Sequence, residues 1–202
     1  MCCRYWIDDS PELREITDEM KHSPLMSRWQ RRSEIKTGGE IRPQDIVPVI
    51  APDRSGERAV FPMKWGYSGK SLLINARAET AAVKATFQND WRKHRCIVPA
   101  SWYFEWEHVV GNDGRTHTGK KYKILPKDSS ITWLCGLYRI EEGMPHFVIL
   151  TRDPAAEIRF IHDRMPMILP ENRIIAWIRP DSQPEQLIGE ALTAMTYAQV
   201  PR

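Results

Sequence analysis

The pattern of hydrophobic and polar positions predicts a chain of many short β-strands and a few helices. Near the start, Pro11 marks a helix start, and Leu13, Ile16 and Met20 recur on one face of a helix over residues 11–21. Short β-rich runs follow at residues 46–50, 59–67, 72–75, 96–98, 102–107, 122–125, 131–138 and 146–151. Helical patterns interrupt these runs at residues 79–92, 154–162, 171–177 and 184–192.

This mixture of elements predicts an α+β fold with a largely antiparallel, barrel-like sheet core and peripheral helices. The Asn-Asp-Gly run at 112–114 is a strong turn signal between two of the expected strands. Residues 22–44 are irregular and basic, so we expect a long surface loop there. No repeat or linker divides residues 1–202, which we therefore expect to form a single domain.

Composition excludes several classes of protein. The 202 residues are 42% hydrophobic and 27% charged, which is the balance of a globular protein. No apolar run is long enough to span a membrane, and no apolar leader follows Met1, so we expect a cytoplasmic protein with no membrane partner. The net charge of +3 permits a nucleic-acid partner without indicating one.

The cysteines fit a reducing compartment. Cys96 and Cys135 lie in apolar runs, which predicts that both are buried as small hydrophobic side chains. The chain has no Cys-x-x-Cys motif and no paired histidine spacing, so we expect neither a metal site nor another cofactor.

Cys2 has the most distinctive chemistry in the sequence. A small residue at this position normally allows Met1 to be removed, which would leave a free α-amine beside the thiol. The α-amine has an ordinary pKa of about 8 and the thiol one of about 8.5, so both supply nucleophile near neutral pH. Such a 1,2-aminothiol condenses with an aldehyde to a Schiff base, which the thiol closes to a thiazolidine. The alternative is a chance cysteine at a frayed terminus.

Three further places combine polar side chains with a defined structural context. Asn75 and Arg77 stand where an expected strand passes into an expected helix, and could simply cap that helix. Glu105 is a lone carboxylate in an aromatic strand, and could face solvent. His162 lies at the end of an expected helix, where it could complement the helix dipole.

Taken together, these blocks resemble the SOS response-associated peptidase (SRAP) family from Cys2 to about Thr196. The blocks that carry the resemblance are Cys2, Arg42-Pro43, Met63-Lys64-Trp65-Gly66, NARAET at 75–80, CIVPASWYFEW at 96–106, CGLY at 135–138 and IHDRMP at 161–166. Their order and spacing make the resemblance specific. The chain departs from the family at Cys3, where the family usually has glycine, and follows its pattern only loosely over 193–200.

The resemblance implies a self-processing enzyme that loses Met1, recognises abasic sites in single-stranded DNA and links to them covalently through Cys2. It implies that Asn75 holds the Cys2 amine or the sugar by hydrogen bonds. Glu105 would be the acid/base, and His162 would lie beside the opened sugar and its phosphate. A lyase-type reaction at abasic sites is compatible with the same residues.

The resemblance also implies a DNA-binding surface that reads backbone and lesion rather than base sequence. The residues expected to contact DNA are Arg4, Arg77 and Arg164 at phosphates, and Pro43, Trp65 and Trp106 as apolar wedges or stacking faces. Burial among Trp102, Phe104 and Trp106 would raise the pKa of Glu105. We expect a monomer that associates with the nucleoid when it is bound to DNA.

Three alternatives remain open from the sequence. An N-terminal-nucleophile amidotransferase also uses a processed N-terminal cysteine, but usually follows it with Gly-Ile and needs a synthetase domain. A true cysteine protease would use Cys2, His162 and Asn75. A non-catalytic single-strand-binding module would use the tryptophan and arginine side chains alone, and would bind without regard to the lesion.

Overall fold

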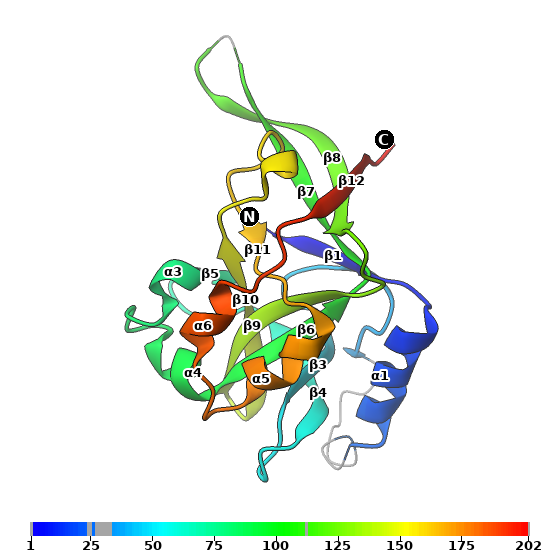
Figure 1. Ribbon diagram of the computed structural model, residues 1–202, viewed down its shortest axis with the longest axis vertical. Helices are drawn as coiled ribbons and strands as arrows, with labels where there is room; N and C mark the ends of the chain where they lie inside the picture. The colour runs from blue at the N-terminus through cyan, green and yellow to red at the C-terminus, as the bar shows by residue number, and fades with distance from the viewer. Residues whose placement is uncertain (1, 24–25, 27–33, 112, 202) are drawn as a thin grey trace.

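The computed structural model describes residues 2–23, 26, 34–111 and 113–201 (Figure 1). The expected first helix is confirmed as α1 (Pro11–Lys21), and Leu13, Ile16 and Met20 are all buried. Residues 24–25 and 27–33 of the expected basic loop lie outside the described residues. The end of that loop was predicted wrongly, because β2 (Gly39–Ile41) forms there by pairing with β1.

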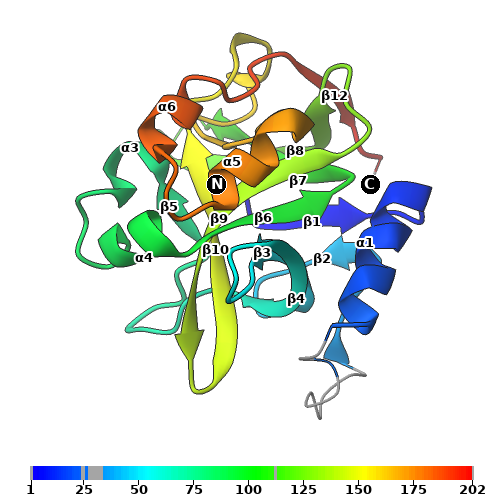
Figure 2. The same ribbon diagram turned by 60° about the horizontal axis from the view of Figure 1, so that its bottom comes forward.

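A closed β-barrel forms the core of the molecule (Figure 2). Its strands are β3 (Ile46–Pro52), β4 (Arg58–Trp65), β6 (Arg95–Ala100), β9 (Thr132–Glu141) and β10 (Met144–Arg152). They pair in the order β10–β4–β3–β6–β9, and β9 pairs back onto β10 to close the ring. Every one of these pairings is antiparallel except β10–β4. Cys96 and Cys135 are fully buried on β6 and β9, as expected.

Strand β10 also holds two short strands that matter for the site. β5 (Asn75–Arg77) pairs with it in parallel, with Asn75 opposite Ile149. β11 (Met165–Pro166) pairs with it in antiparallel fashion, with Pro166 opposite Thr151. Two segments that are far apart in the sequence are therefore fixed on either edge of β10, at the same end of this strand.

A second, antiparallel sheet packs beside the barrel. In spatial order its strands are β12 (Met195–Gln199), β8 (Thr116–Pro126), β7 (Trp102–Val110), β1 (Arg4–Ile7) and β2. The long β7–β8 hairpin projects from the rest of the molecule (Figure 1). Gly114 occupies the left-handed region, φ +71°, near its tip, where the turn signal was expected.

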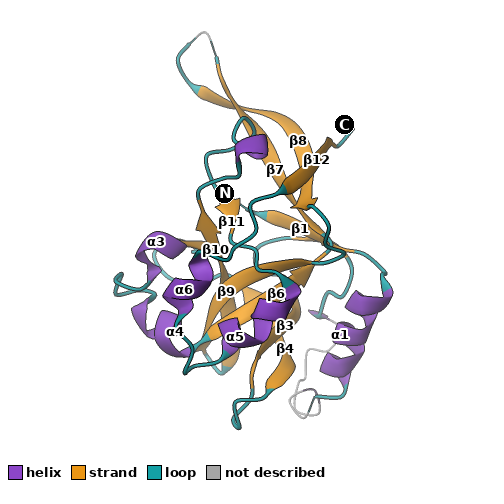
Figure 3. Ribbon diagram, in the orientation of Figure 1, coloured by secondary structure: helices purple, strands orange, loops and turns teal. Residues whose placement is uncertain are grey.

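Short helices cover the barrel, with α3, α4 and α6 on one side and α1 on the other (Figure 3). Their bounds are α3 (Ala78–Ala81), α4 (Gln88–Lys93), α5 (Ile174–Ile178) and α6 (Pro184–Ile188). The helix expected over 79–92 is broken into α3 and α4. The prediction of a helix over 154–162 is wrong, because only the 3₁₀ turn η2 (Ala156–Ile158) forms there. The carbonyl oxygen of Ile161 instead accepts a hydrogen bond from the backbone N–H of His108 in β7. Among the described residues, no helix has the length and apolar composition to cross a membrane.

Candidate functional site

The site forms where the start of the chain meets the segments that β10 holds. Cys2 is fully buried immediately before β1, and the Asn75 side chain reaches it from β5. Nδ2 of Asn75 donates a hydrogen bond to the Cys2 carbonyl oxygen at 2.9 Å. Asn75 does not cap a helix, because the residue at the N-cap of α3 is Arg77 and no side chain caps that helix. The amide therefore positions the backbone of Cys2.

The thiol of Cys2 lies in an environment that favours its neutral form. Burial raises its pKa well above the ordinary value, and the nearby charge of Glu105 raises it further. Its Sγ makes only a long contact of 3.8 Å with the carbonyl oxygen of Arg4. The resting side chain is therefore a thiol rather than a thiolate.

Glu105 is buried on the face of β7 that looks toward Cys2. Its side chain is 4% exposed, and burial raises its pKa. The expectation that it might face solvent is wrong. The expected cause of its burial is also wrong, since Phe104 and Trp106 point to the opposite face of the strand and Tyr103 shares the face of Glu105. The carboxyl is thus a proton donor or acceptor placed beside the thiol and out of water.

His162 is a neutral imidazole whose ring lies against that of His108, a residue that interacts electrostatically with Glu105. Desolvation lowers its pKa to about 4 and outweighs the opposing attraction of Asp163, whose side chain is 79% exposed. The Arg164 backbone N–H donates to Nδ1 at 3.0 Å, and Oδ1 of Asp163 lies 2.7 Å from the same nitrogen. The helix-dipole interpretation is wrong because no helix ends here. Its charge does not neutralise a phosphate at neutral pH, although its N–H can donate.

Sequence reasoning missed three residues of the site. His108 follows a bulge in β7 and its ring lies 4.0 Å from that of His162. Tyr5 and Tyr103 face each other across β1 and β7, and both are fully buried. The described residues offer no hydrogen-bond partner to either hydroxyl. The cross-strand register would have been the signal, but the sequence did not predict β1.

Cys2 interacts electrostatically with both tyrosines. Burial raises the pKa of Tyr5 and of Tyr103 well above the ordinary value, and a charge on Cys2 would raise each further. The side chain of Asn75 adds an Oδ1 atom that is buried and has no partner among the described residues. The site therefore holds polar groups that are ready to bind a further molecule.

The three arginines predicted to contact DNA have different environments. Arg77 is exposed at the end of β5. Arg4 donates to the Cys3 carbonyl oxygen at 2.7 Å and stays partly exposed. Arg164 is less accessible: its side chain is only 10% exposed, and it forms ion pairs of 2.8 Å with Glu79 and with Asp153. Its guanidinium is already neutralised and holds the 162–166 segment in place.

The apolar residues predicted to contact DNA also differ in their exposure to solvent. Trp65 is fully buried, donates from Nε1 to the Ile74 carbonyl oxygen and packs against Tyr5, so its proposed role as a stacking face is wrong. Trp106 and Pro43 are partly exposed and keep surface that a ligand can reach. Trp65 instead supports the wall of the site through Tyr5.

One group of side chains in the described structure has donors that could converge on a metal ion. His108, His162 and Asp163 place one donor atom each within 4.8 Å of one another. Nδ1 of His162 already accepts a hydrogen bond from the Arg164 backbone, which engages that nitrogen. The acid/base chemistry described above does not depend on such an ion.

Comparison with known proteins gives the same assignment from several directions. The family model "SOS response associated peptidase (SRAP)" matches residues 1–201. "Abasic site processing protein YoaM" of Bacillus subtilis (strain 168) is 34% identical over 170 residues, 77% of this chain and 72% of that protein. "Abasic site processing protein YedK" of Escherichia coli (strain K12) is 30% identical over 141 residues, 66% of this chain and 61% of YedK.

The fold is shared with solved structures as well. A crystal structure of a protein from Bacteroides thetaiotaomicron superposes with a TM-score of 0.73 at 22% identity, and the match covers 100% of this chain and 93% of that one. This likeness shows the fold, while the family model and the relatives show common descent. The chain therefore belongs to the SOS response associated peptidase (SRAP) family.

Proposed function

We propose that this protein binds abasic sites in single-stranded DNA and becomes covalently linked to them through Cys2. Two of its relatives are named abasic site processing proteins. The observation that carries the proposal is the pairing of the buried Cys2 with the buried carboxyl of Glu105, close enough for the charge of one to shift the pKa of the other. An aminothiol with an acid/base beside it and water excluded is suited to trap an aldehyde.

The reactive form of the chain lacks Met1. Hydrolysis of the peptide bond between Met1 and Cys2 consumes one water and exposes the α-amine of Cys2. Self-cleavage, which the family name suggests, and ordinary removal of the initiator methionine give the same mature chain. Asn75 holds the Cys2 carbonyl oxygen, so the new amine is anchored from its own residue.

The reaction forms two bonds to one carbon and releases one water. The α-amine adds to the C1′ aldehyde of the ring-opened sugar, and the resulting carbinolamine loses water to give a Schiff base. The thiol then adds to the same carbon while its proton passes to the nitrogen, which closes the thiazolidine. No oxidant or reductant is required.

Each side chain of the site has a role in this sequence. Glu105, whose pKa is raised by burial, can protonate the departing hydroxyl of the carbinolamine and can accept the thiol proton. His162 can donate a hydrogen bond from its neutral ring without carrying charge. The hydroxyls of Tyr5 and Tyr103 are donors for the opened sugar or for the sulfur as negative charge develops on it.

The geometry disfavours the cysteine protease interpretation. Such an enzyme activates its nucleophile as a thiolate beside a charged or proton-accepting histidine. Here burial raises the pKa of Cys2 and lowers that of His162 to about 4, so the thiol resists ionisation and the imidazole is a weak proton acceptor at pH 7. Asn75 also bonds to the Cys2 backbone and so is not used to orient the imidazole.

The decisive experiment measures the intact mass of the protein after incubation with an abasic single-stranded oligonucleotide. We expect the purified chain to lack Met1 and to form a heat-stable adduct whose mass is the sum of both components minus one water. Cys2→Ala should lose this adduct, because without sulfur the Schiff base cannot close, although borohydride can still trap the imine.

Cys3→Ala is the matched control, since it removes the neighbouring thiol and leaves the aminothiol intact. It should retain the heat-stable adduct. Undiminished heat-stable adduct from Cys2→Ala would overturn the proposal. Lesion-independent binding without any adduct from the wild-type chain would favour the non-catalytic alternative.

A further inference from the structure

The outer face of the second sheet carries aromatic and basic side chains in alternating positions. Trp6 lies opposite Trp102 and Arg4 opposite Phe104, while Phe104 also faces Lys123 on the next strand. Side chains in register share one face of a sheet, and Tyr103 and Glu105 occupy the other. The aromatic–basic face is defined by Arg4, Trp6, Trp102, Phe104, Lys121 and Lys123.

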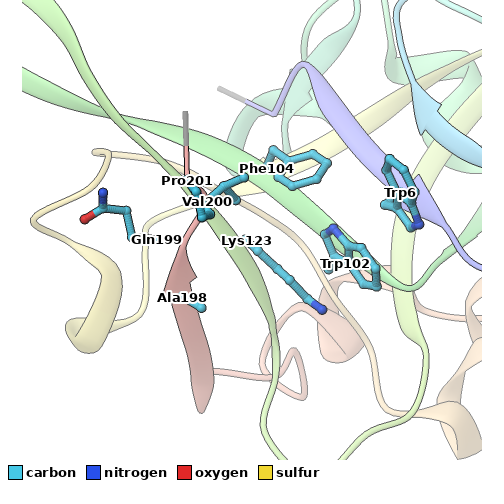
Figure 4. Close-up of a pocket in the computed structure, with 8 residues that line it drawn as sticks. All are labelled: Trp6, Trp102, Phe104, Lys123, Ala198, Gln199, Val200 and Pro201. Atoms are coloured by element: carbon cyan, nitrogen blue, oxygen red, sulfur yellow. The ribbon is translucent and has the colours of Figure 1, made fainter.

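A pocket of about 300 Å³ opens on this face (Figure 4). Trp6, Trp102, Phe104 and Lys123 line it together with residues 198–201, which follow and include the end of β12. This volume is at the lower end of the range for small-molecule sites, so it suits one flat ring better than a stretch of peptide. The pocket is separate from the site of Cys2, because its walls are on the opposite face of the sheet.

The rings of the pocket are arranged for stacking. Trp6 and Trp102 are parallel, with an interplanar angle of 4° and centroids 5.7 Å apart. Phe104 meets both rings edge-on at 6.4 Å. Lys123 Nζ lies 3.4 Å from the centroid of Trp102, and Lys121 Nζ lies 3.8 Å from that of Phe104. Trp102 and Phe104 are thus each paired with a positive charge.

The charges beside the pocket favour an anionic partner. Glu40 is a carboxylate shared by three cations: Lys121 at 2.8 Å, Arg42 at 3.0 Å and Arg4 at 3.5 Å. Glu40 can balance only one of these three positive charges. An apolar side chain from a protein partner would fill the pocket but would gain nothing from these cations.

Stacked aromatic rings beside positive charges form the surface that binds single-stranded nucleic acid without reading its sequence. We propose that the aromatic–basic face binds the DNA strand flanking the abasic site, with one unpaired base in the pocket and phosphates at Lys121, Lys123 and Arg4. This inference rests on the proposed function.

The position of Cys2 is compatible with such a path. Cys2 precedes β1. A DNA strand that is held at Cys2 can therefore pass the end of β1 and continue along Arg4 toward Trp6. At about 3.3 Å per residue of extended protein chain, Trp6 lies roughly 13 Å from Cys2. The pocket therefore takes a base a few nucleotides away from the lesion.

The test measures binding of abasic oligonucleotides in which the strand is lengthened one nucleotide at a time on either side of the lesion. Fluorescence anisotropy with the Cys2→Ala chain reports affinity without covalent capture. We expect affinity to rise when the strand on one side becomes long enough to reach the pocket. In the Cys2→Ala background, Trp102→Leu should lose this gain in affinity. The loss should be roughly 5- to 150-fold in the dissociation constant, which corresponds to the stacking of one base on an aromatic ring.

Lys123→Glu tests the same site without removing an aromatic side chain from the face, and it should lower the dependence of affinity on salt. Ile140→Ala and Lys84→Glu are matched controls at exposed positions on other elements, and both should keep the rise. Thermal unfolding confirms that each variant is folded.

The outcomes separate this inference from the proposed function. If Lys123→Glu and a folded Trp102→Leu both keep the full dependence on strand length and salt, the face does not bind the flanking strand, and a protein side chain becomes the better candidate for the pocket. The proposed function is judged on the wild-type chain alone, by whether it forms the adduct with an abasic oligonucleotide.

Discussion

At the scale of single residues, the burial of Glu105 connects stability with chemistry. A carboxyl that is 4% exposed is costly to ionise, and this cost raises its pKa. The same raised pKa makes it a better proton donor near neutral pH. The folded chain therefore keeps a destabilising residue at the position where an acid/base is needed.

Replacing Glu105 by Gln separates these two effects. Gln is nearly isosteric and can hydrogen-bond, but it cannot exchange a proton, so adduct formation should slow by about 10²–10⁴-fold. Single-turnover rates on an abasic oligonucleotide across a pH series measure this. A Glu105→Gln rate equal to that of wild type at every pH would remove Glu105 from the chemistry.

The same substitution should stabilise the folded chain although it slows adduct formation. Because the folded pKa of Glu105 is raised, the wild-type chain loses stability as the pH rises from the unfolded value of about 4.5 through the folded pKa. Glu105→Gln does not titrate, so its free energy of unfolding relative to wild type should increase over this range and then level. Denaturant unfolding at several pH values tests the sign, and Glu107→Gln, on the same strand, is the control.

The residues of the site could be predicted from the sequence better than their environments. Asn75 contacts the backbone of Cys2, and Glu105 interacts electrostatically with its thiol, while the role of each in the reaction stays a prediction. The expected charge of His162 and the expected burial of Glu105 by its aromatic neighbours were wrong. The burial of Glu105 depends on which face of β7 is inside, and a period-two pattern gives the alternation without saying which face that is. His162 lies in a loop, whose burial by neighbouring segments leaves no periodic signal in the sequence.

At the scale of elements, β10 is the scaffold of the site. It pairs with β5, which carries Asn75, and with β11, which follows His162. Arg164 strengthens this arrangement by bonding to Glu79, in α3, and to the Thr151 carbonyl oxygen, in β10. We therefore expect this arginine, predicted from the sequence to bind phosphate, to act as a positioning residue that ties three elements together.

Arg77→Ala and Arg164→Ala should therefore have different effects. Loss of the exposed Arg77 should weaken DNA binding and reduce its salt slope by about one unit, since one phosphate contact is removed. Loss of Arg164 should leave the salt slope unchanged but slow adduct formation, because His162 is released from its position. Affinities over a salt series, together with single-turnover rates, distinguish the two.

Arg54→Ala, in the exposed turn between β3 and β4, is the matched control for loss of a positive charge. A reduced salt slope for Arg164→Ala would contradict its assignment as a positioning residue. An unchanged slope for Arg77→Ala would remove Arg77 from the interface.

Most barrel strands were predictable, whereas the terminal and shortest strands were not. The runs at 46–50, 96–98 and 131–138 fall within β3, β6 and β9. Strands β1 and β12 gave no clear signal, because each is short and is fixed by its neighbours in the sheet rather than by its own apolar pattern. Both strands border places of interest, since β1 follows Cys2 and β12 borders the pocket of the aromatic–basic face.

At the scale of the whole molecule, the site lies between the barrel and the second sheet. β5 and β11 approach from the barrel, while β1 and β7 belong to the sheet. Burying the site between them excludes water from Cys2 and Glu105, but it also buries His162, whose side chain is 7% exposed. The packing of the two layers is therefore coupled to the protonation of this imidazole.

This coupling predicts how acid affects the folded state. The pKa of His162 is lowered to about 4 in the folded chain, against an ordinary value of about 6.5 when unfolded. Between these values the unfolded chain binds a proton that the folded chain does not, so the free energy of unfolding should decrease as the pH falls from about 6.5 to about 4. His162→Gln cannot take up that proton, and its stability should fall less steeply over this interval.

Chemical denaturation at half-unit pH steps measures the difference in slope between wild type and His162→Gln. Near pH 5 the variant should take up about one proton fewer than wild type when it unfolds. His117→Gln is the control, because this histidine is 57% exposed on the β7–β8 hairpin, away from the contact between the two layers. It should reproduce the wild-type curve. Parallel curves for wild type and His162→Gln from pH 6.5 to pH 4 would show that the imidazole is not held neutral by burial, and would remove the argument that it acts as an uncharged donor in the site.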